Sequence, residues 1–220
     1  MDNIIVIGSS GHAKVVIDII EKQALFHIAG LIDRFKSKGE MSFQYPILGA
    51  EEDIPEILKT LNVIGGVIAI GDNWVRSKVA STIKELIPDF RFISAIHPSS
   101  QIARGVKIGA GTVVMAGTVI NSDSIIGEHC IVNTKSSIGH DNVIGDFVTI
   151  APNATTGGNV KIQNYSVLSL GASVIHHINI GEHTVIGAGS TVIYDVPSFV
   201  VAFGTPAKVQ RERVIGEKYL

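Results

Sequence analysis

Residues 102–113 read Ile102-Ala-Arg-Gly-Val-Lys-Ile-Gly-Ala-Gly-Thr-Val113, two blocks of six that each begin with isoleucine. The pattern continues through Pro197 without an added or missing residue, which makes 16 consecutive hexapeptides. The first residue is Ile, Leu or Val in every block except the one that begins with Thr156. A period of six is a multiple of the strand period of two and does not fit the 3.6-residue turn of a helix. Hexapeptide repetition of this kind predicts a parallel β-helix.

The repeat predicts a triangular coil in which three hexapeptides, one on each side, make a full turn. The first-position aliphatic side chains then point inward and stack coil on coil, so the stack itself is the hydrophobic core. An ordinary β-sandwich is the alternative, but its strands are spaced irregularly. The single cysteine, Cys130, stands at an inward fifth position and cannot form an internal disulfide, so we expect a small core residue.

The first 97 residues have a different pattern, in which short apolar runs alternate with amphipathic stretches. We expect strands at 3–7, 28–32, 66–71 and 91–93, and helices after Gly11 (with Val15, Val16, Ile19 and Ile20 on one face), at 51–61 (with Ile54, Ile57, Leu58 and Leu61) and at 74–87. This alternation predicts a small parallel sheet with helices packed against it, a Rossmann-like α/β domain.

The domain junction is marked by His97-Pro98-Ser99-Ser100, which interrupts both patterns. The expected organisation is an α/β domain over 1–97, an all-β parallel β-helix over 98–203, and a C-terminal turn and tail over 204–220. A final strand is expected at 198–203. The tail from Val209 to Leu220 has mixed charge and is expected to form a short helix.

The composition excludes some classes of partner. With 18 basic and 20 acidic residues the net charge is -2, so no nucleic-acid surface is expected. The chain begins without a basic leader and contains no apolar run of the roughly 18 residues that cross a bilayer, so we expect a soluble cytoplasmic protein with no membrane partner. Only 17% of residues are charged, which suits a protein that buries much surface, as in an oligomer.

A glycine-containing turn follows the first predicted strand. Gly8 and Gly11 allow a tight turn, and the start of the next helix offers free N–H groups to a phosphate. Asp33 ends the second strand, where it could accept a hydrogen bond from a ribose or a base. The residues expected at the carboxyl ends of strands are Ser10, Gly11, His12, Asp33 and Gly71. The third glycine of a full dinucleotide fingerprint is missing, and a turn without a ligand is the alternative.

His140 is the histidine with the most suggestive surroundings. One full turn of the repeat separates it from Gly158 in the next coil and from Ser122 in the previous one. Stacked strands lie about 4.8 Å apart, so the glycine is expected to leave open space and an accessible backbone N–H beside the imidazole. A base on one coil and a hydrogen-bond donor on the next form an arrangement that would suit a bound thioester. A surface histidine at a coil corner is the alternative.

The remaining histidines have ordinary interpretations. His129 and His183 are separated by three full turns of the repeat and are expected to share one exposed column. His176 and His177 are expected to face solvent. Because no cysteine or carboxylate cluster completes a set of ligands, no metal site is expected.

The hexapeptide register and the ending Gly204-Thr-Pro-Ala-Lys208 resemble the hexapeptide-repeat acyltransferases, whose β-helix is left-handed. The stretch Gly8-Ser-Ser-Gly-His-Ala-Lys-Val-Val-Ile-Asp18 is similar to the opening of the branch of sugar acetyltransferases that couples a small α/β domain to the β-helix. In that branch the α/β domain holds the nucleotide of a nucleotide-linked sugar. The resemblance implies a nucleotide pocket lined by Ser10, Gly11, His12, Asp33, Arg34 and Gly71.

Ser136-Ser-Ile-Gly-His140-Asp141 resembles the catalytic segment of the aminosugar N-acetyltransferases in this branch. The resemblance implies that His140 is the general base and that Asp141 assists it. It also implies contacts to acetyl-CoA from Thr149, Gly158, Leu170, Ala188, Gly204, Pro206 and Lys208. Thr149 departs from the pattern, since several relatives have a histidine there. Members of the family are homotrimers with active sites between neighbouring β-helices.

The implied reaction is acetyl transfer from acetyl-CoA to an amine, at C4 of a nucleotide-linked 4-amino-4,6-dideoxy sugar, for surface glycan biosynthesis. The amine attacks directly, without a covalent acetyl-enzyme, and UDP, dTDP and GDP remain open as the nucleotide. An O-acetyltransferase acting on a sialic acid-type hydroxyl is the main alternative. A purely structural β-helix is disfavoured by His140 and Asp141, and a dinucleotide oxidoreductase by the incomplete fingerprint.

Overall fold

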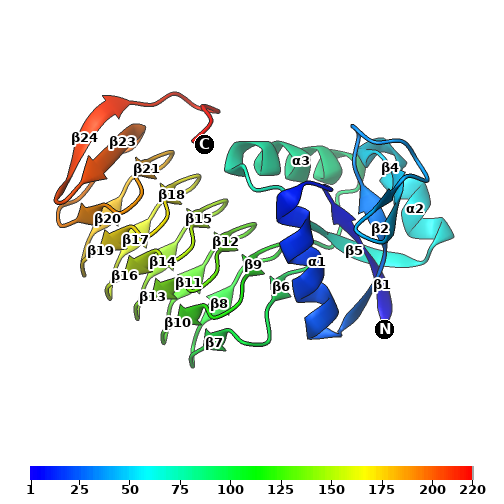
Figure 1. The fold of residues 1–220 in the computed structure, drawn as a ribbon, viewed down its shortest axis with the longest axis horizontal. Helices are drawn as coiled ribbons and strands as arrows, with labels where there is room; N and C mark the ends of the chain where they lie inside the picture. The colour runs from blue at the N-terminus through cyan, green and yellow to red at the C-terminus, as the bar shows by residue number, and fades with distance from the viewer. Residues whose placement is uncertain (220) are drawn as a thin grey trace. The chain divides into compact units, whose positions relative to one another are not determined.

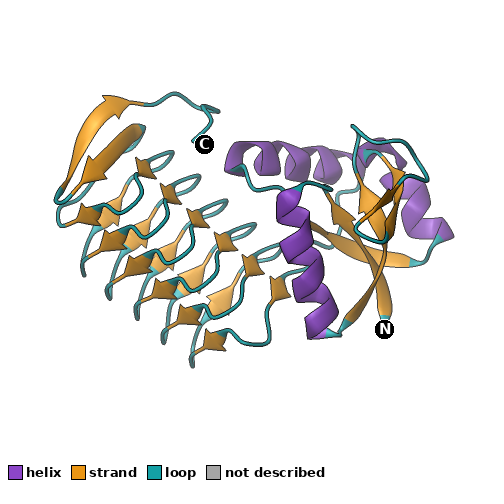
Figure 2. Ribbon diagram, viewed as in Figure 1, coloured by secondary structure: helices purple, strands orange, loops and turns teal. Residues whose placement is uncertain are grey.

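The computed structural model describes residues 1–219. They form two compact units, one spanning Met1–Pro98 and the other beginning at Ser99 (Figure 1). Among the described residues, the helices lie in the first unit and the second is built from short strands and turns (Figure 2). None of the described helices has the length and apolar character needed to cross a membrane.

The first unit is a small α/β domain. In chain order it contains β1 (Asp2–Ile7), α1 (Gly11–Gln23), β2 (Phe26–Ile32), β3 (Met41–Ser42), β4 (Tyr45–Gly49), the 3₁₀ turn η1 (Glu51–Asp53), α2 (Ile54–Thr60), β5 (Val63–Ile68), α3 (Asn73–Leu86) and β6 (Ala95–Ile96). The sheet order is β3-β4-β2-β1-β5. All pairs are parallel except β3 with β4. Because β2 and β5 flank β1, the strand order reverses at β1, where such sheets bind ligands beyond their carboxyl ends.

The core of this unit follows from the apolar runs. Residues Ile4 to Ile7 of β1 are buried, as expected for a central parallel strand covered on both faces. On α1 the buried positions are Ala13, Val16, Ile17, Ile19 and Ile20, a stripe spaced by three and four residues. Val15 was expected in this stripe and is exposed, because the buried face is centred between Val16 and Ile20.

Other expectations for the first unit were wrong in detail. The helix expected at 51–61 begins at Ile54, after η1, and Leu61 lies exposed beyond its end. The strand expected at 91–93 is an isolated bridge between Phe92 and Gly66. The hairpin of β3 and β4 was not expected, because Phe43 and Gln44 adopt positive φ (50° and 70°) at its turn without the usual glycine or asparagine signal.

The second unit confirms the coil of three hexapeptides per turn. Between residues 101 and 192 each hexapeptide contributes one two-residue strand: β7 (Gln101–Ile102), β8 (Lys107–Ile108), β9 (Val113–Val114), β10 (Val119–Ile120), β11 (Ile125–Ile126), β12 (Ile131–Val132), β13 (Ser137–Ile138), β14 (Val143–Ile144), β15 (Thr149–Ile150), β16 (Thr155–Thr156), β17 (Lys161–Ile162), β18 (Val167–Leu168), β19 (Ser173–Val174), β20 (Asn179–Ile180), β21 (Val185–Ile186) and β22 (Thr191–Val192). Each strand pairs in parallel with the strand three blocks away, as Ile120 does with Ile138.

The strands form three parallel sheets, one on each side of the triangular coil. We name the three corners by their residues. The His140 corner comprises 121–124, 139–142, 157–160 and 175–178, the aromatic corner comprises 127–130, 145–148, 163–166 and 181–184, and the Leu170 corner comprises 133–136, 151–154, 169–172 and 187–190. First-position residues such as Ile120, Ile150 and Leu168 are fully buried inside, and so is Cys130, as expected.

The fourth residue of a hexapeptide makes the turn at each corner. It has a left-handed conformation at Asp123, His129, Asp141 and Tyr165, with φ of 60°, 53°, 55° and 60°. Asp, Asn and His tolerate this region better than most residues, and glycine best of all. The turn at Asp141 brings its side chain back toward His140, which a straight strand would not do.

The aromatic corner corrects one expectation. His129 and His183 were expected to be exposed, yet both are buried. They belong to a column of stacked rings, His129, Phe147, Tyr165, His183 and Phe199, whose successive centroids lie 5.0, 5.3, 4.6 and 5.2 Å apart. The coil returns each ring to a place over the one before it, so the rings cover one another. Burial lowers the pKa of His183 below its usual value.

The chain after the last coil forms a hairpin. Strand β23 (Val200–Gly204) continues the sheet beside β21, and β24 (Ala207–Glu212) pairs with it in antiparallel orientation. The helix expected from Val209 onward is therefore wrong for 209–212, and Leu220 lies outside the described residues. Strand β24 supplies main-chain partners to β23, which would otherwise be an open edge.

Candidate active site and nucleotide cleft

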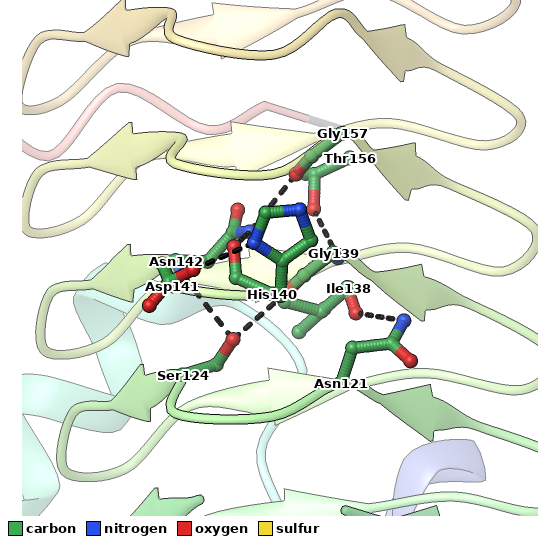
Figure 3. A network of polar contacts seen from close by, with 9 residues as sticks. All are labelled: Asn121, Ser124, Ile138, Gly139, His140, Asp141, Asn142, Thr156 and Gly157. Carbon is green, nitrogen blue, oxygen red and sulfur yellow. Dashed lines mark hydrogen bonds and ion pairs between the residues drawn. The ribbon is translucent and has the colours of Figure 1, made fainter.

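His140 and Asp141 form a close pair at the His140 corner. Nδ1 of His140 lies 2.6 Å from Oδ2 of Asp141, and the His140 side chain is 61% exposed (Figure 3). A carboxylate at this distance holds the proton on Nδ1, so Nε2 carries the lone pair. The structure thus brings together the two residues predicted to be catalytic, with the imidazole oriented and accessible.

Buried polar groups fix the backbone of this corner (Figure 3). Nδ2 of Asn142 donates to the carbonyl oxygen of His140 at 3.0 Å and to that of Gly157 at 2.9 Å. The hydroxyl of Ser124 donates to the carbonyl oxygen of Gly139 at 2.7 Å. Both polar side chains are fully buried at fifth positions of the repeat. They tie three successive coils together beneath His140, which gives the base a rigid support.

Gly158 lies directly against the imidazole. A Cβ at this position would stand 2.4 Å from Nε2 of His140 and 2.5 Å from its Cε1. The open space expected beside the histidine is therefore occupied by the ring itself, and only a glycine accommodates it. Within residues 1–219 the N–H of Gly158 donates to no other group. It is a free donor one coil from the base.

The other residues assigned to acetyl-CoA lie elsewhere on the coil. Leu170 and Ala188 are exposed and belong to the Leu170 corner. The hairpin turn with Gly204, Pro206 and Lys208 adjoins that corner, since the Ser190 hydroxyl accepts from the N–H of Gly204 at 3.1 Å. Thr149 is buried on the outer side of β15. Of the residues predicted to contact acetyl-CoA, only Gly158 lies beside His140 within the described part of one chain.

The first unit contains a cleft of about 380 Å³ at the carboxyl ends of β1 and β2. Of the predicted residues, Ser10, Asp33 and Arg34 line it. Gly8 lines it as well, with a φ of +109°, and a Cβ there would lie 3.0 Å from the carbonyl oxygen of Ala69. Ser10 precedes α1 without capping it through its side chain, so its hydroxyl is left for a ligand. The cleft combines a tight turn with a helix start, as anion sites do.

Asp33 organises the cleft wall. Its Oδ2 accepts from the Ser9 hydroxyl at 2.5 Å, and its Oδ1 accepts from the N–H of Phe35 at 2.9 Å. Both carboxylate oxygens are thus used inside the protein. Asp33 thereby links the loop after β1, which carries Ser9, to the loop after β2, which carries Phe35. Its contact with a ribose or a base stays a prediction.

Three predicted residues do not line this cleft. Gly11 begins α1 and has open space around its α-carbon. The carbonyl oxygen of Gly71 accepts from Nη1 of the buried Arg76 at 2.8 Å. Nε2 of His12 is buried without a hydrogen-bond partner among the described residues. Burial, and then the charge of Arg76, lowers the pKa of His12 to about 4, so this imidazole is neutral at pH 7.

The cleft also has residues that the sequence did not point to, namely Phe35, Glu51 and Lys78. Glu51 is well separated from Asp33 along the chain, but β4 runs beside β2 and delivers it to the same edge of the sheet. Recognising the short strand 45–49 would have predicted this placement. No group of three or more His, Cys, Asp or Glu residues within the described part of the chain is arranged to hold a metal ion.

Comparison with known proteins gives consistent matches. Residues 3–83 match the PglD N-terminal domain. The chain is 37% identical to UDP-N-acetylbacillosamine N-acetyltransferase of Bacillus subtilis (strain 168) over 112 residues, which span half of this chain and half of that protein.

Two solved structures are similar over almost the whole chain. One is perosamine N-acetyltransferase from Caulobacter crescentus, in a variant with one histidine replaced by asparagine and in complex with CoA and GDP-perosamine. It has a TM-score of 0.89 and 32% identity, with coverage of 96% of this chain and 98% of that one. The other is the acetyltransferase domain of PglB from Neisseria gonorrhoeae FA1090 in complex with acetyl coenzyme A, with a TM-score of 0.86, 28% identity and coverage of 94% and 98%.

Because these matches cover nearly the full length of both chains, this chain and the two acetyltransferases share both the α/β unit and the stacked hexapeptides. The α/β unit corresponds to the PglD N-terminal domain, and the stacked hexapeptides correspond to the left-handed β-helix. This chain belongs to the family of left-handed β-helix acetyltransferases that act on nucleotide-linked aminosugars.

Proposed function

We propose that this protein transfers the acetyl group of acetyl-CoA to the C4 amine of a nucleotide-linked 4-amino-4,6-dideoxy sugar, a step in surface glycan biosynthesis. The observation that carries the proposal is the 2.6 Å contact of His140 with Asp141, which leaves Nε2 as an oriented base beside Gly158. The two solved structures that match over both units are a perosamine N-acetyltransferase and an acetyltransferase domain, names of the same reaction class.

In the proposed reaction His140 acts as the general base. Its Nε2 takes a proton from the amine as the nitrogen attacks the thioester carbon. The C–N bond forms, the C–S bond breaks, and the proton passes from His140 to the departing thiolate. A positioned base contributes roughly 10²- to 10⁴-fold to such a rate. Asp141 stabilises the imidazolium while it exists, and the free N–H of Gly158 is suited to the oxyanion of the tetrahedral intermediate.

The two units divide the work. We assign the nucleotide to the cleft of residues 1–97, with Ser10, Asp33 and Arg34 on its wall. Residues 98–203 carry acyl transfer, and the turn and tail of 204–220 contact CoA together with Leu170 and Ala188. Acetyl-CoA and sugar nucleotides are cytoplasmic metabolites, so we place the reaction in the cytoplasm.

A homotrimer would unite the CoA contacts. His140 and Gly158 occupy one corner of the coil, and Leu170 and Ala188 occupy another. We therefore place the ligand between two neighbouring β-helices, an arrangement that a closed ring of three chains would provide. Light scattering coupled to gel filtration should report three chains. Mixing His140→Ala protein with Leu170→Asp protein should restore activity, because some interfaces then carry both intact corners.

Release of free thiol from acetyl-CoA tests the chemistry, with a panel of 4-amino and hydroxyl sugar nucleotides as acceptors. Wild type should turn over an amino sugar, and His140→Ala should lose roughly 10²-fold or more. The matched control is His177→Asn, an exposed histidine of the same corner whose positive φ asparagine tolerates. Turnover that survives His140→Ala would remove the base from its role, and activity on hydroxyl acceptors alone would make the enzyme an O-acetyltransferase.

A further inference from the structure

One end of the cleft carries a charged pair that the proposed reaction does not use. Glu51, the first residue of η1, lines the cleft with its side chain only 7% exposed. Nε and Nη2 of Arg34 both lie 3.0 Å from the same oxygen, Oε2. Within the described chain Oε1 accepts no hydrogen bond. Oε1 is not one of the buried polar atoms that lack a partner, so it is open to the cleft, where a ligand N–H can donate to it.

The neighbouring side chain is aromatic. Phe35 lies on the cleft wall and is 91% exposed, the most solvent-accessible large apolar side chain in the described part of the molecule. Its N–H is bonded to Asp33, which fixes the loop that carries the ring. A ring presented to solvent on a fixed loop offers a stacking surface for a nucleobase.

We infer that Arg34, Glu51 and Phe35 select the nucleobase, and that they favour guanine, uracil and thymine over adenine and cytosine. This inference rests on the proposed use of the cleft for a nucleotide. The favoured bases present a ring N–H beside a carbonyl oxygen. Oε1 of Glu51 can accept from that N–H while the Arg34 guanidinium donates to the oxygen. Adenine and cytosine present an unprotonated ring nitrogen beside an amino group. The ring nitrogen would face the Glu51 carboxylate, acceptor against acceptor, and the amino group would face the Arg34 guanidinium, donor against donor.

The arrangement also assigns the rest of the ligand. With the base between Phe35 and the Arg34–Glu51 pair, the turn of Gly8 to Ser10, which lines the same cleft and directly precedes α1, is left for the phosphates. The Ser10 hydroxyl caps no helix N–H, so it can donate to a diphosphate there. Phe35 then contributes affinity for any base, and Glu51 contributes the choice among bases.

Calorimetric titration of the full-length protein with GDP, UDP, dTDP, CDP and ADP tests this without any acetyl transfer. We expect the first three to bind at least about 10-fold more tightly than CDP and ADP, the worth of one charged hydrogen bond. Glu51→Gln should abolish that preference, since an amide can present either a donor or an acceptor. Glu52→Gln is the matched control: Glu52 also approaches Arg34, at 3.4 Å, but is 67% exposed and does not line the cleft.

Phe35→Ala should weaken all five nucleotides by a similar factor of roughly 10, and Phe35→Tyr should restore binding because the ring remains. Circular dichroism confirms that each variant is folded. Equal binding of all five nucleotides, or binding of none, would overturn the inference. Base preference without acetyl transfer would instead contradict the proposed function and leave this assignment standing.

Discussion

Replacement of Gly158 by alanine should remove most of the activity while leaving the fold intact. The new Cβ would stand 2.4 Å from Nε2 of His140, and ordinary contact requires at least 3.4 Å. The imidazole must therefore move by about 1 Å or rotate away, and either movement breaks the 2.6 Å contact with Asp141. A displacement of this size at a reacting group costs on the order of 10²-fold in rate, or about 2.7 kcal/mol of activation free energy.

The same substitution should have little effect on stability. Alanine already occupies the third position of other hexapeptides, at Ala110, Ala116 and Ala188, so the backbone there accepts a Cβ. The His140 side chain is mostly exposed and can leave without opening a cavity. We expect the free energy of unfolding to change by less than about 1 kcal/mol.

The assay is thiol release under saturating substrates, with wild type, Gly158→Ala, His140→Ala and the double variant. Alanine keeps the backbone N–H, so an effect of Gly158→Ala reports the position of the base and not the loss of an oxyanion donor. If both substitutions act through the imidazole, the double variant should be no slower than His140→Ala. A Gly158→Ala enzyme with wild-type kcat would refute the argument, and so would two independent losses that multiply.

Three further predictions concern other parts of the molecule. Asp141→Asn keeps the left-handed turn, because asparagine tolerates φ of 55°, but should lower kcat by roughly 10²-fold. A variant with the kcat of wild type would show that the carboxylate does not act on His140. The pKa of His12 is about 4 in the folded protein and near 6.5 in the unfolded chain, so the unfolded state binds more protons between these pH values. The unfolding free energy of the first unit should therefore fall by up to about 3 kcal/mol as the pH drops from 6.5 to 4. Urea titrations of the His12→Gln variant should lack this pH-dependent loss of stability. Tyr165→Asn removes the middle ring of the aromatic column and should destabilise the second unit by about 2–3 kcal/mol, whereas Tyr165→Phe keeps both ring contacts and should stay within about 1 kcal/mol in thermal unfolding; equal losses would assign the effect to the hydroxyl.

The repeat made the second unit predictable in detail. Because residues one full turn apart must stack, the sequence alone placed Gly158 over His140 and placed Cys130 inside. Periodicity does not report how side chains outside the coil cover one another. The fourth-position rings of His129 and His183 point outward by register, and only their mutual stacking with Phe147, Tyr165 and Phe199 buries them.

The first unit was predictable in outline but not at its cleft. Helix α1 and the strand ends gave the carboxyl edge of the sheet, where Ser10, Asp33 and Arg34 do line a cleft. The internal hydrogen bonds of Asp33 were not predictable, since its partners, the Ser9 hydroxyl and the Phe35 N–H, come from loop geometry that no local pattern encodes. Glu51 was missed because a hairpin with an unusual turn precedes it.

The register of three hexapeptides per turn also limits how this protein can change length over evolution. Insertion of a whole coil would add about 4.8 Å to the stack and leave every later side chain above the same column as before. Insertion of a single hexapeptide would turn the rest of the coil by one third of a revolution, carrying Leu170 and Ala188 from their own corner to another. Deletion of a single hexapeptide between Gly158 and Leu170 would turn the rest of the coil by one third of a revolution in the opposite direction. Active length variants of this enzyme should therefore differ by whole coils in the segment between His140 and the CoA contacts. Insertions and deletions shorter than a coil should lie outside the repeats or form a loop that protrudes from a single corner.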